Sequence, residues 1–310
     1  MNKIVLLIKY FFDKKVRFDV NNYNFHKYDK LPDEQFLKME FENKMGYKLD
    51  LENPTTACEL FQWYKLYYRD PLFSKIVDKS EFKKYVESKL GDGYTIPTLG
   101  IYNSFEEINF DVLPNKFIIK TTHSSGGFVV CNDKTTFDIN KAKKIINKSL
   151  KTDYYITHRE WAYKHASRKI IIEPLIESLG KSDSIEYKII TINGKVELFT
   201  ICRGIAHTFN ERKNDFYDRN FNKLDMEITY NRNSHIENTK PLEFDKLIEL
   251  SEKLSEGIPH VRCDFYVDNG KIYVGEMTFY TWAGLINFIP KEWDLKLGSK
   301  FIIPAKITND

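Results

Sequence analysis

Apolar residues recur every three or four positions between residues 32 and 90, and this spacing predicts helices. Acidic residues follow a proline at the start of the first run, and Gly46 stops that run, as glycine often does just past a helix. Asp70-Pro71 should end a second helix. The aromatic residues of these helices suit a core, so we expect residues 1–95 to form an N-terminal helical region without chemistry of its own.

Beyond residue 96 the pattern changes to short apolar runs separated by loops, which is typical of strands. Residues 116–120 and 128–131 should pair across a glycine-rich tip, whereas the mixed stretch 149–168 should be helical. We expect residues 96–172 to form a small lobe that carries this glycine-rich loop.

Asn-Gly pairs at residues 193–194 and 269–270 each separate two runs rich in β-branched and aromatic residues. This arrangement is the strongest short signal for a β-hairpin. Helical spacing over residues 242–255 predicts a helix against one face of the resulting sheet. We therefore expect residues 173–310 to form a large lobe, and the whole chain to be α+β with mainly antiparallel sheets.

The terminal hairpin carries the most suggestive chemistry. Because side chains alternate along a strand, Asp264 should share a face with Arg262, and Glu276 should share one with Thr278 and Val274. Two adjacent carboxylates repel unless a cation lies between them, and Mg²⁺ is commonly held by one or two carboxylates plus phosphates. Arg262 could meet a phosphate oxygen. The alternative is a half-buried hairpin whose acids face solvent.

The glycine-rich tip is a second candidate site. Adjacent glycines, Gly126 and Gly127, let backbone N–H groups turn toward an anion, and the hydroxyl groups of Ser124 and Ser125 add donors. Lys120 should lie beneath this loop, which could then cover phosphates. The alternative is an ordinary loop that binds no ligand. The segment is not a Walker loop, because no Gly-Lys-Ser/Thr follows it.

An apolar run over residues 169–176 predicts a buried strand that ends in Glu173 and Pro174. Because proline cannot donate a ladder hydrogen bond, the strand should open there into a connector. We expect free backbone groups in that connector, available to a ligand such as adenine.

Composition narrows the class of protein. The chain of 310 residues has a net charge of only +3, which does not indicate nucleic-acid binding. The apolar stretch 4–12 is too short to span a bilayer, so we expect a docked helix, with a membrane-surface anchor as the alternative and at most peripheral membrane contact. Unpaired cysteine spacing suggests neither zinc nor disulfides and fits the cytoplasm; the cysteines are Cys58, Cys131, Cys202 and Cys263.

The order of these features is a lysine strand, a Ser/Gly loop, a strand ending in an acid, an Asn-Gly hairpin with an inner lysine, and a terminal Asp/Glu hairpin. The segments with the clearest motifs are 63–73, 78–79, 113–120, 123–127, 159–161, 186–188, 262–266 and 275–280. On these segments the chain resembles the ATP-grasp superfamily, and within it the teichuronopeptide-biosynthesis (TupA-like) ATP-grasp family. The resemblance runs from about residue 54 to 288 and implies an ATP-grasp fold, in which two antiparallel-sheet lobes grip ATP.

The resemblance implies how this chain would hold a nucleotide. ATP phosphates would contact Lys120 and Lys188, and the glycine-rich loop would close over them. Glu186 falls where D-alanine:D-alanine ligases place an acid that binds ribose. The set is completed by loop residues over the phosphates and connector residues against adenine: Ser124, Ser125, Gly126, Gly127, Glu173, Pro174, Leu175 and Ile176.

The resemblance also implies a metal and catalytic set. Asp264 and Glu276 would hold Mg²⁺, and Arg262 would meet the transferring phosphate. Most ATP-grasp enzymes place asparagine two residues after the glutamate; here Thr278 stands at that position and is the corresponding candidate ligand. Arg203, which leaves the end of a hairpin strand, is a further catalytic candidate.

The activity implied is ADP-forming ligation of a carboxylate to an amine through an acyl phosphate. The acceptors would be small molecules or glycans, such as a sugar acid and an amino acid, in capsule or surface-polysaccharide biosynthesis. Two alternatives stay open: a sugar kinase that transfers phosphate to a hydroxyl, and a non-catalytic carbohydrate-binding protein. The sequence predicts no particular oligomeric state.

Overall fold

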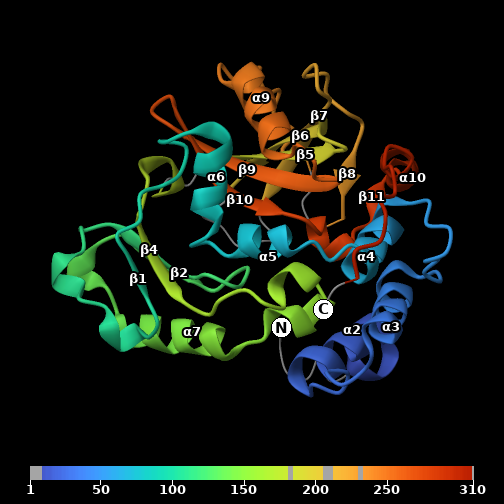
Figure 1. Cartoon of the computed structure of the whole chain (residues 1–310), viewed down its shortest axis with the longest axis horizontal. Helices are drawn as coiled ribbons and strands as arrows, with labels where there is room; N and C mark the ends of the chain where they lie inside the picture. The colour runs from blue at the N-terminus through green and yellow to red at the C-terminus, as the bar shows by residue number, and fades with distance from the viewer. Residues whose placement is uncertain (1–8, 181–183, 205–211, 230–232, 309–310) are drawn as a thin grey trace.

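The computed structural model describes residues 9–180, 184–204, 212–229 and 233–308 (Figure 1). These residues form a four-stranded, a five-stranded and a two-stranded sheet, with helices packed around them. Each pair of neighbouring strands within these sheets is antiparallel. The predicted α+β class with antiparallel sheets is therefore confirmed.

Local signals start and stop the N-terminal helices. Thr56 caps α4 by accepting the backbone N–H of Glu59, whose carboxylate accepts the Thr56 N–H in return. Asp70 caps α5 with Pro71 in its first turn, and Gly46 ends α3 at a left-handed φ of 85°. The elements are α2 (Lys14–Asp19), α3 (Asp33–Met45), α4 (Ala57–Tyr67), α5 (Pro71–Val77) and α6 (Phe82–Leu90).

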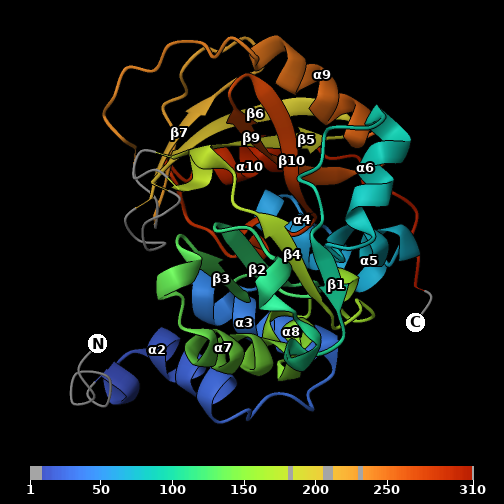
Figure 2. The ribbon, with the colours of Figure 1, turned by 90° about the vertical axis from the view of Figure 1, so that its left-hand side faces the viewer.

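The four-stranded sheet has the strand order β1-β4-β2-β3 and packs against α7, which lies below it in Figure 2. Phe117 and Ile172 of the sheet meet Ile146 of the helix in a core of their own. The elements are β1 (Gly100–Tyr102), β2 (Phe117–Thr121), β3 (Phe128–Cys131), α7 (Ile139–Lys151) and β4 (Ile170–Pro174).

The single helical stretch expected over residues 149–168 is wrong. α7 begins earlier and ends at Lys151, and Asp153 then caps a separate short helix, α8 (Tyr154–His158). Arg159 stops α8 because it adopts the left-handed conformation, with φ 53°. One 3₁₀ turn, Trp161–Tyr163, follows before the chain reaches β4.

The five-stranded sheet has the order β10-β9-β5-β6-β7 and contains both predicted hairpins. Asn193 and Gly194 in one turn, and Asn269 and Gly270 in the other, all have positive φ, as tight hairpin turns of this kind require. α9 covers one face and is itself flanked by α6. The elements are β5 (Ile185–Ile192), β6 (Lys195–Arg203), β7 (Lys213–Tyr217), α9 (Phe244–Leu254), β9 (His260–Asp268) and β10 (Lys271–Thr278).

A bulge at Gly275 corrects one expectation about the terminal hairpin. Val274 pairs with Phe265 and Glu276 pairs with Asp264, so Gly275 is an extra residue on β10. The inserted residue reverses the alternation, and Val274 is buried in the core instead of sharing the Glu276 face. The bulge thus leaves Glu276 on the face of Asp264 while the rest of β10 closes the core.

The remaining elements complete the large-sheet side. A short helix, α10 (Glu292–Gly298), packs against α4 and against a two-stranded sheet. The strands of that sheet are β8 (Glu227–Ile228) and β11 (Phe288–Ile289). Across the described ranges, none of the helices combines the length and the apolar composition needed to cross a bilayer. Most of the N-terminal stretch 4–12 lies outside those ranges.

The apolar core unites the N-terminal helices with the large sheet. Phe36, Trp63 and Val86 belong to the same cluster of buried side chains as Ile189 and Phe265, whereas the four-stranded sheet has a separate core. β4 also runs to Pro174, two residues beyond the expected boundary at 172. The three-part division at residues 95 and 172 remains a proposal.

Candidate functional site

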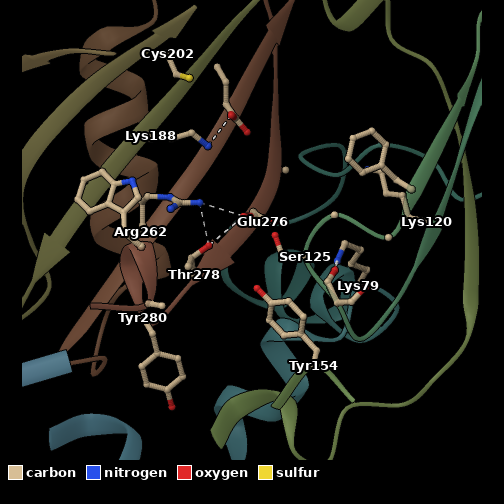
Figure 3. Close-up of a pocket in the computed structure, with 18 of the residues that line it drawn as sticks. Lys79, Lys120, Ser125, Tyr154, Lys188, Cys202, Arg262, Glu276, Thr278 and Tyr280 are labelled. Atoms are coloured by element: carbon tan, nitrogen blue, oxygen red, sulfur yellow. Dashed lines mark hydrogen bonds and ion pairs between the residues drawn. The ribbon is translucent and has the colours of Figure 1, made fainter. Parts of the chain in front are cut away.

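A cleft of about 960 Å³ runs between the four-stranded and five-stranded sheets. Its walls include the glycine-rich loop on one side and the terminal hairpin on the other, and Figure 3 shows the side chains of both projecting into it. The predicted site residues that line it are Lys120, Ser124, Ser125, Gly126, Gly127, Leu175, Glu186, Lys188, Arg262, Glu276 and Thr278. The fold therefore gathers residues that are up to 158 positions apart, from Lys120 to Thr278, around one space.

The glycine-rich loop is held by hydroxyl groups at its base. The Ser124 hydroxyl lies 2.6 Å from that of Thr121 and 3.1 Å from that of Ser149 on α7. A Cβ atom at Gly127 would come within 2.1 Å of the Ser149 oxygen, so only glycine fits there. Ser125 and Gly126, by contrast, are exposed at the tip. The base of the loop is thus anchored, and its tip faces the cleft.

Lys120 and Glu173 form an ion pair beneath this loop, with Nζ 2.6 Å from Oε2. Lys83 binds the other carboxylate oxygen at 2.5 Å. Although burial acts in the opposite direction, the two lysines hold the pKa of Glu173 below its usual range. Lys120 lines the cleft, whereas Glu173 does not; its carboxylate positions the lysine.

The adenine connector is placed only in part as expected. Leu175 lines the cleft, but Pro174 and Ile176 do not. We expected the backbone N–H of Leu175 to be free for a ligand. Instead it donates a hydrogen bond to the carbonyl oxygen of Lys116 at 3.3 Å. The connector therefore continues the edge of the sheet for one residue past Pro174.

Lys79 is a cleft residue that our sequence reasoning gave no role. Its Nζ donates to the carbonyl oxygen of Ser124 at 2.6 Å, and burial lowers the pKa of its ammonium group. Asp78 fixes the preceding turn by accepting hydrogen bonds from Ser80 and Ser167. The sequence marked Asp78-Lys79 only as part of a family motif. No local pattern indicates that Lys79 contacts the glycine-rich loop, 45 residues further along the chain.

The floor of the cleft is a network of two cations and two carboxylates. The Arg262 guanidinium lies 2.6 Å from both oxygens of Asp264 and 3.1 Å from Oε1 of Glu276. Lys188 Nζ approaches Asp264 Oδ2 at 2.7 Å. Although burial opposes it, these two cations hold the pKa of the fully buried Asp264 below its usual range. Figure 3 shows the Arg262, Glu276 and Thr278 part of this network.

Asp264 and Glu276 are the acids that the sequence assigned to a metal ion. Glu276 lines the cleft, whereas Asp264 is fully buried behind the lining, with both of its oxygens bound by Arg262 and Lys188. The two acids face each other in the register of β9 and β10, but the described residues contain no cluster of three or more His, Cys, Asp or Glu side chains suited to a metal. Two carboxylates fit Mg²⁺ when phosphate oxygens supply further ligands. Thr278 Oγ1 accepts from Arg262 and donates to Glu276, so it orients these groups as the structure stands.

Glu186 belongs to the same floor and is buried. Its Oε1 accepts a hydrogen bond from the Tyr266 hydroxyl at 2.8 Å, and its Oε2 lies 2.6 Å from Lys188 Nζ. Lys188 thus bridges Glu186 and Asp264, and these acids raise its pKa although burial opposes them. The ammonium group is fixed in the cleft with its charge retained.

Arg203 is not brought to the cleft. Strand alternation places its neighbour Cys202 in the cleft wall instead, and the Arg203 guanidinium donates to Asn238. The expectation that Arg203 faces the reacting groups is therefore wrong in position. Arg212 and Asn214, at the start of β7, line the cleft, and no sequence motif had marked them.

A further wall is built by residues that follow α7. Tyr154, Glu160 and Tyr163 line the cleft, and so do Tyr23 and Lys44 from the N-terminal region. None of these residues entered the predicted site. Each acquires its place only through packing of segments distant in the chain.

Comparison with known proteins gives one family match. A family model described as TupA-like ATPgrasp matches residues 59–302. No curated protein matches the sequence significantly. The family that the motifs indicated is thus the one whose model covers most of the chain.

Several solved structures are also similar. D-alanine–D-alanine ligase from Bacillus anthracis, complexed with ATP, shares 18% identity over 67% of this chain and 57% of its own, with a TM-score of 0.42. The Helicobacter pylori enzyme shares 16% over 72% and 56%, with a TM-score of 0.41. L-amino acid ligase from Bacillus licheniformis shares 14% over 66% and 43%, with a TM-score of 0.42. The matches span roughly half the length of these proteins.

Proposed function

Because this chain belongs to the TupA-like ATP-grasp family, we propose that it is an ATP-dependent carboxylate–amine ligase whose active site is the cleft between its two main sheets. Family membership confirms the ATP-grasp fold expected from the motifs. The reaction, its substrates and the roles of individual residues are proposals.

The convergence of cations from both sheets is the observation that carries this function. Lys79 and Lys120 come from the side of the glycine-rich loop, and Lys188 and Arg262 from the opposite sheet, and all four line one cleft. Each is now satisfied by a carboxylate or carbonyl oxygen at 2.6–3.1 Å. A triphosphate offers oxygens that compete for these charge-assisted contacts.

In this proposal the loop covers the phosphates. Backbone N–H groups near Ser125 and Gly126 are free to turn toward an anion, because the tip is exposed while its base is tied to α7. Lys120 and Lys188 bind phosphate oxygens from below. Leu175 and Glu186 lie on the side where the nucleoside would extend.

Asp264 and Glu276 would hold Mg²⁺, which supplies charge neutralisation at the phosphates when bound. Arg262, which now bridges these two acids, would turn one of its N–H groups to the transferring phosphoryl group. The Thr278 hydroxyl keeps Glu276 in place. Fixed cations in a cleft of this kind stabilise the charge that develops during transfer.

The chemistry proceeds in two steps. A carboxylate oxygen attacks the γ-phosphorus of ATP, and the bond between that phosphorus and the β–γ bridging oxygen breaks. The products of this step are an acyl phosphate and ADP. The neutral amine nitrogen then attacks the acyl carbon, the carbon–oxygen bond breaks, and the amide forms as phosphate leaves and takes up the proton that the nitrogen loses. We propose a sugar acid or amino acid as the carboxylate, within cytoplasmic steps of capsule or surface-polysaccharide biosynthesis.

An acceptor screen tests the proposal. The chain is incubated with ATP and Mg²⁺ against uronic acids and acidic amino acids, each paired with amino acids, and ADP release and products are measured. We expect ADP release that needs both acceptors and an amide product identified by mass spectrometry. A phosphorylated sugar formed without amine would make the protein a kinase, and absence of ATP binding in any condition would remove the catalytic proposal.

A further inference from the structure

Glu160 is the acid of the cleft that has no cationic partner. Within the described residues, the acidic side chains that line the cleft are those of Glu160, Glu186 and Glu276. Lys188 pairs with Glu186 at 2.6 Å and Arg262 pairs with Glu276 at 3.1 Å. In those same ranges neither an ion pair nor a hydrogen bond reaches the Glu160 carboxylate, although the residue is only 5% exposed.

A buried carboxylate without a partner is costly to keep ionised. Burial raises the pKa of Glu160, and Lys65 and His158 counter that effect only from a distance. Lys65 is bound elsewhere, since its Nζ donates to Gln62 and to the carbonyl oxygen of Ala283. The Glu160 residue therefore lines the cleft with the hydrogen-bonding capacity of its carboxylate unused.

The backbone that presents Glu160 is fixed by its neighbour. Arg159 holds a left-handed conformation, φ 53°, which non-glycine residues adopt at a cost unless the surroundings enforce it. Its guanidinium, 2% exposed, donates to the carbonyl oxygens of Ile156, Tyr28 and Asp29 at 2.7–3.0 Å and stacks 4.4 Å from the Phe36 ring. The turn that aims Glu160 is thus firmly anchored.

Two tyrosines line the cleft together with Glu160 and feel its charge. Tyr154 and Tyr163 pack edge to face, with ring centroids 4.7 Å apart, and both line the cleft. Burial, followed by nearby acids including Glu160, raises the pKa of each, so both remain neutral phenols. Figure 3 shows the Tyr154 side chain directed into the space bordered by Ser125 and Glu276. The Glu160 wall is therefore continuous with the reacting end of the cleft.

We propose that Glu160, with the rings of Tyr154 and Tyr163, binds the amine acceptor in its ammonium form. A single carboxylate beside aromatic faces suits a monocation with an apolar body, because both the charge and the ring quadrupoles attract it. This inference deepens the proposed function and rests on it, since it assigns the amine of the ligase reaction to this wall. It places the nitrogen on the side of the cleft where Glu276 and Arg262 meet. Before the nitrogen attacks the acyl carbon, the ammonium group gives one proton to the Glu160 carboxylate or to solvent.

Direct binding of a simple probe tests the site without turnover. n-Butylammonium chloride is titrated calorimetrically into the wild-type chain and into Glu160→Gln, with n-butanol as the uncharged probe. We expect the variant to bind butylammonium about tenfold more weakly or worse, since a charge-assisted contact is lost. Glu292→Gln, on the exposed start of α10, controls for net charge and should bind like the wild type.

A trapping assay then separates this inference from the proposed function. Hydroxylamine is largely uncharged at pH 8 and attacks an acyl phosphate directly, its nitrogen bonding to the acyl carbon as phosphate leaves. With ATP, Mg²⁺ and glucuronate, Glu160→Gln should form hydroxamate at the wild-type rate but show at least a tenfold higher KM for L-alanine as amine. ATP affinity should be unchanged.

The outcomes are distinct. Equal butylammonium binding by wild type and Glu160→Gln, or none by the wild type at millimolar concentration, overturns the ammonium site. An unchanged KM for the amine overturns it as well. Hydroxamate formation absent from the wild type with every acid tested would instead contradict the ligase proposal, while the butylammonium result still decides the binding site.

Discussion

Lys188 and Asp264 lie directly opposite each other on the adjacent strands β5 and β9, with Nζ 2.7 Å from Oδ2. Asp264 is fully buried and also accepts two hydrogen bonds from Arg262. The pair joins the two hairpins at the floor of the cleft. It is therefore a structural contact as well as a candidate part of the active site.

We expect Asp264→Asn to destabilise the protein by about 3 kcal/mol, because it leaves buried cations without their anion. The depressed pKa of Asp264 means that its stabilisation is complete above the unfolded pKa of about 3.9 and is lost as pH falls through the folded value. Urea titrations should show the largest difference from wild type at neutral pH. A difference that stays constant from pH 7 to pH 3 would contradict this account.

Glu276→Gln keeps the shape of the side chain but removes its charge. Because an amide oxygen is a poorer ligand for a hard dication, activity should fall by on the order of a hundredfold, about 3 kcal/mol of transition-state stabilisation. The melting temperature should barely change, since the Glu276 side chain is 40% exposed. Normal turnover at limiting Mg²⁺ together with a sharp fall in melting temperature would make Glu276 structural.

Lys120 and Lys83 offer a matched pair of variants. Both bind Glu173, at 2.6 and 2.5 Å, but only Lys120 lines the cleft. Lys120→Met should weaken ATP binding by about 1.5–3 kcal/mol, the usual range for a hydrogen bond with a charged group. Lys83→Met should disturb Glu173 comparably and leave ATP affinity close to wild type. Calorimetric titration with ATP measures both, and equal losses would assign the effect to Glu173.

Glu160→Gln should stabilise the protein at neutral pH. The raised folded pKa of Glu160 favours folding below its unfolded pKa of about 4.3, and that benefit is lost as pH rises through the folded value. At pH 8 the wild type therefore carries an unpaired buried charge, and removing it should add about 1–3 kcal/mol to the free energy of unfolding. The titratable groups acting on Glu160, or on which it acts, are Glu40, Lys65, Tyr154, His158, Tyr163, Arg262 and Tyr280.

Thermal unfolding from pH 4 to pH 8 checks this expectation. The gain of Glu160→Gln over wild type should grow with pH and vanish near pH 4. A variant less stable than wild type at pH 8 would show that the carboxylate makes a stabilising contact in the folded state.

Features with local causes were predictable from the sequence. Both Asn-Gly hairpins form as expected, because the turn requires positive φ at two adjacent residues and few other sequences permit it. Gly46 and Asp70-Pro71 mark helix ends for similarly local reasons. The residues on one hairpin face, Asp264 and Arg262, could be paired by alternation alone.

Features that depend on contacts between distant parts of the chain could not be predicted from the sequence. The Gly275 bulge moves Val274 to the opposite face from Glu276, and a strict two-residue alternation cannot reveal it. Lys79 and Glu160 reach the cleft through packing of segments far apart in the chain, so no spacing marks them. Arg203 was a candidate because it leaves the end of a hairpin strand, but the pairing of β6 with β5 and β7 decides which way that strand end faces.

The anchoring of Arg159 means that the family match and the folded unit of this protein have different boundaries. The family model begins at residue 59, yet the carbonyl oxygens of Tyr28 and Asp29 and the carboxylate of Asp33 hold the arginine that sets the Glu160 turn. Trimming the chain to the family boundary would remove these partners and release that wall of the cleft. The segment before the match is thus part of the framework of the cleft, although it lies outside the family match.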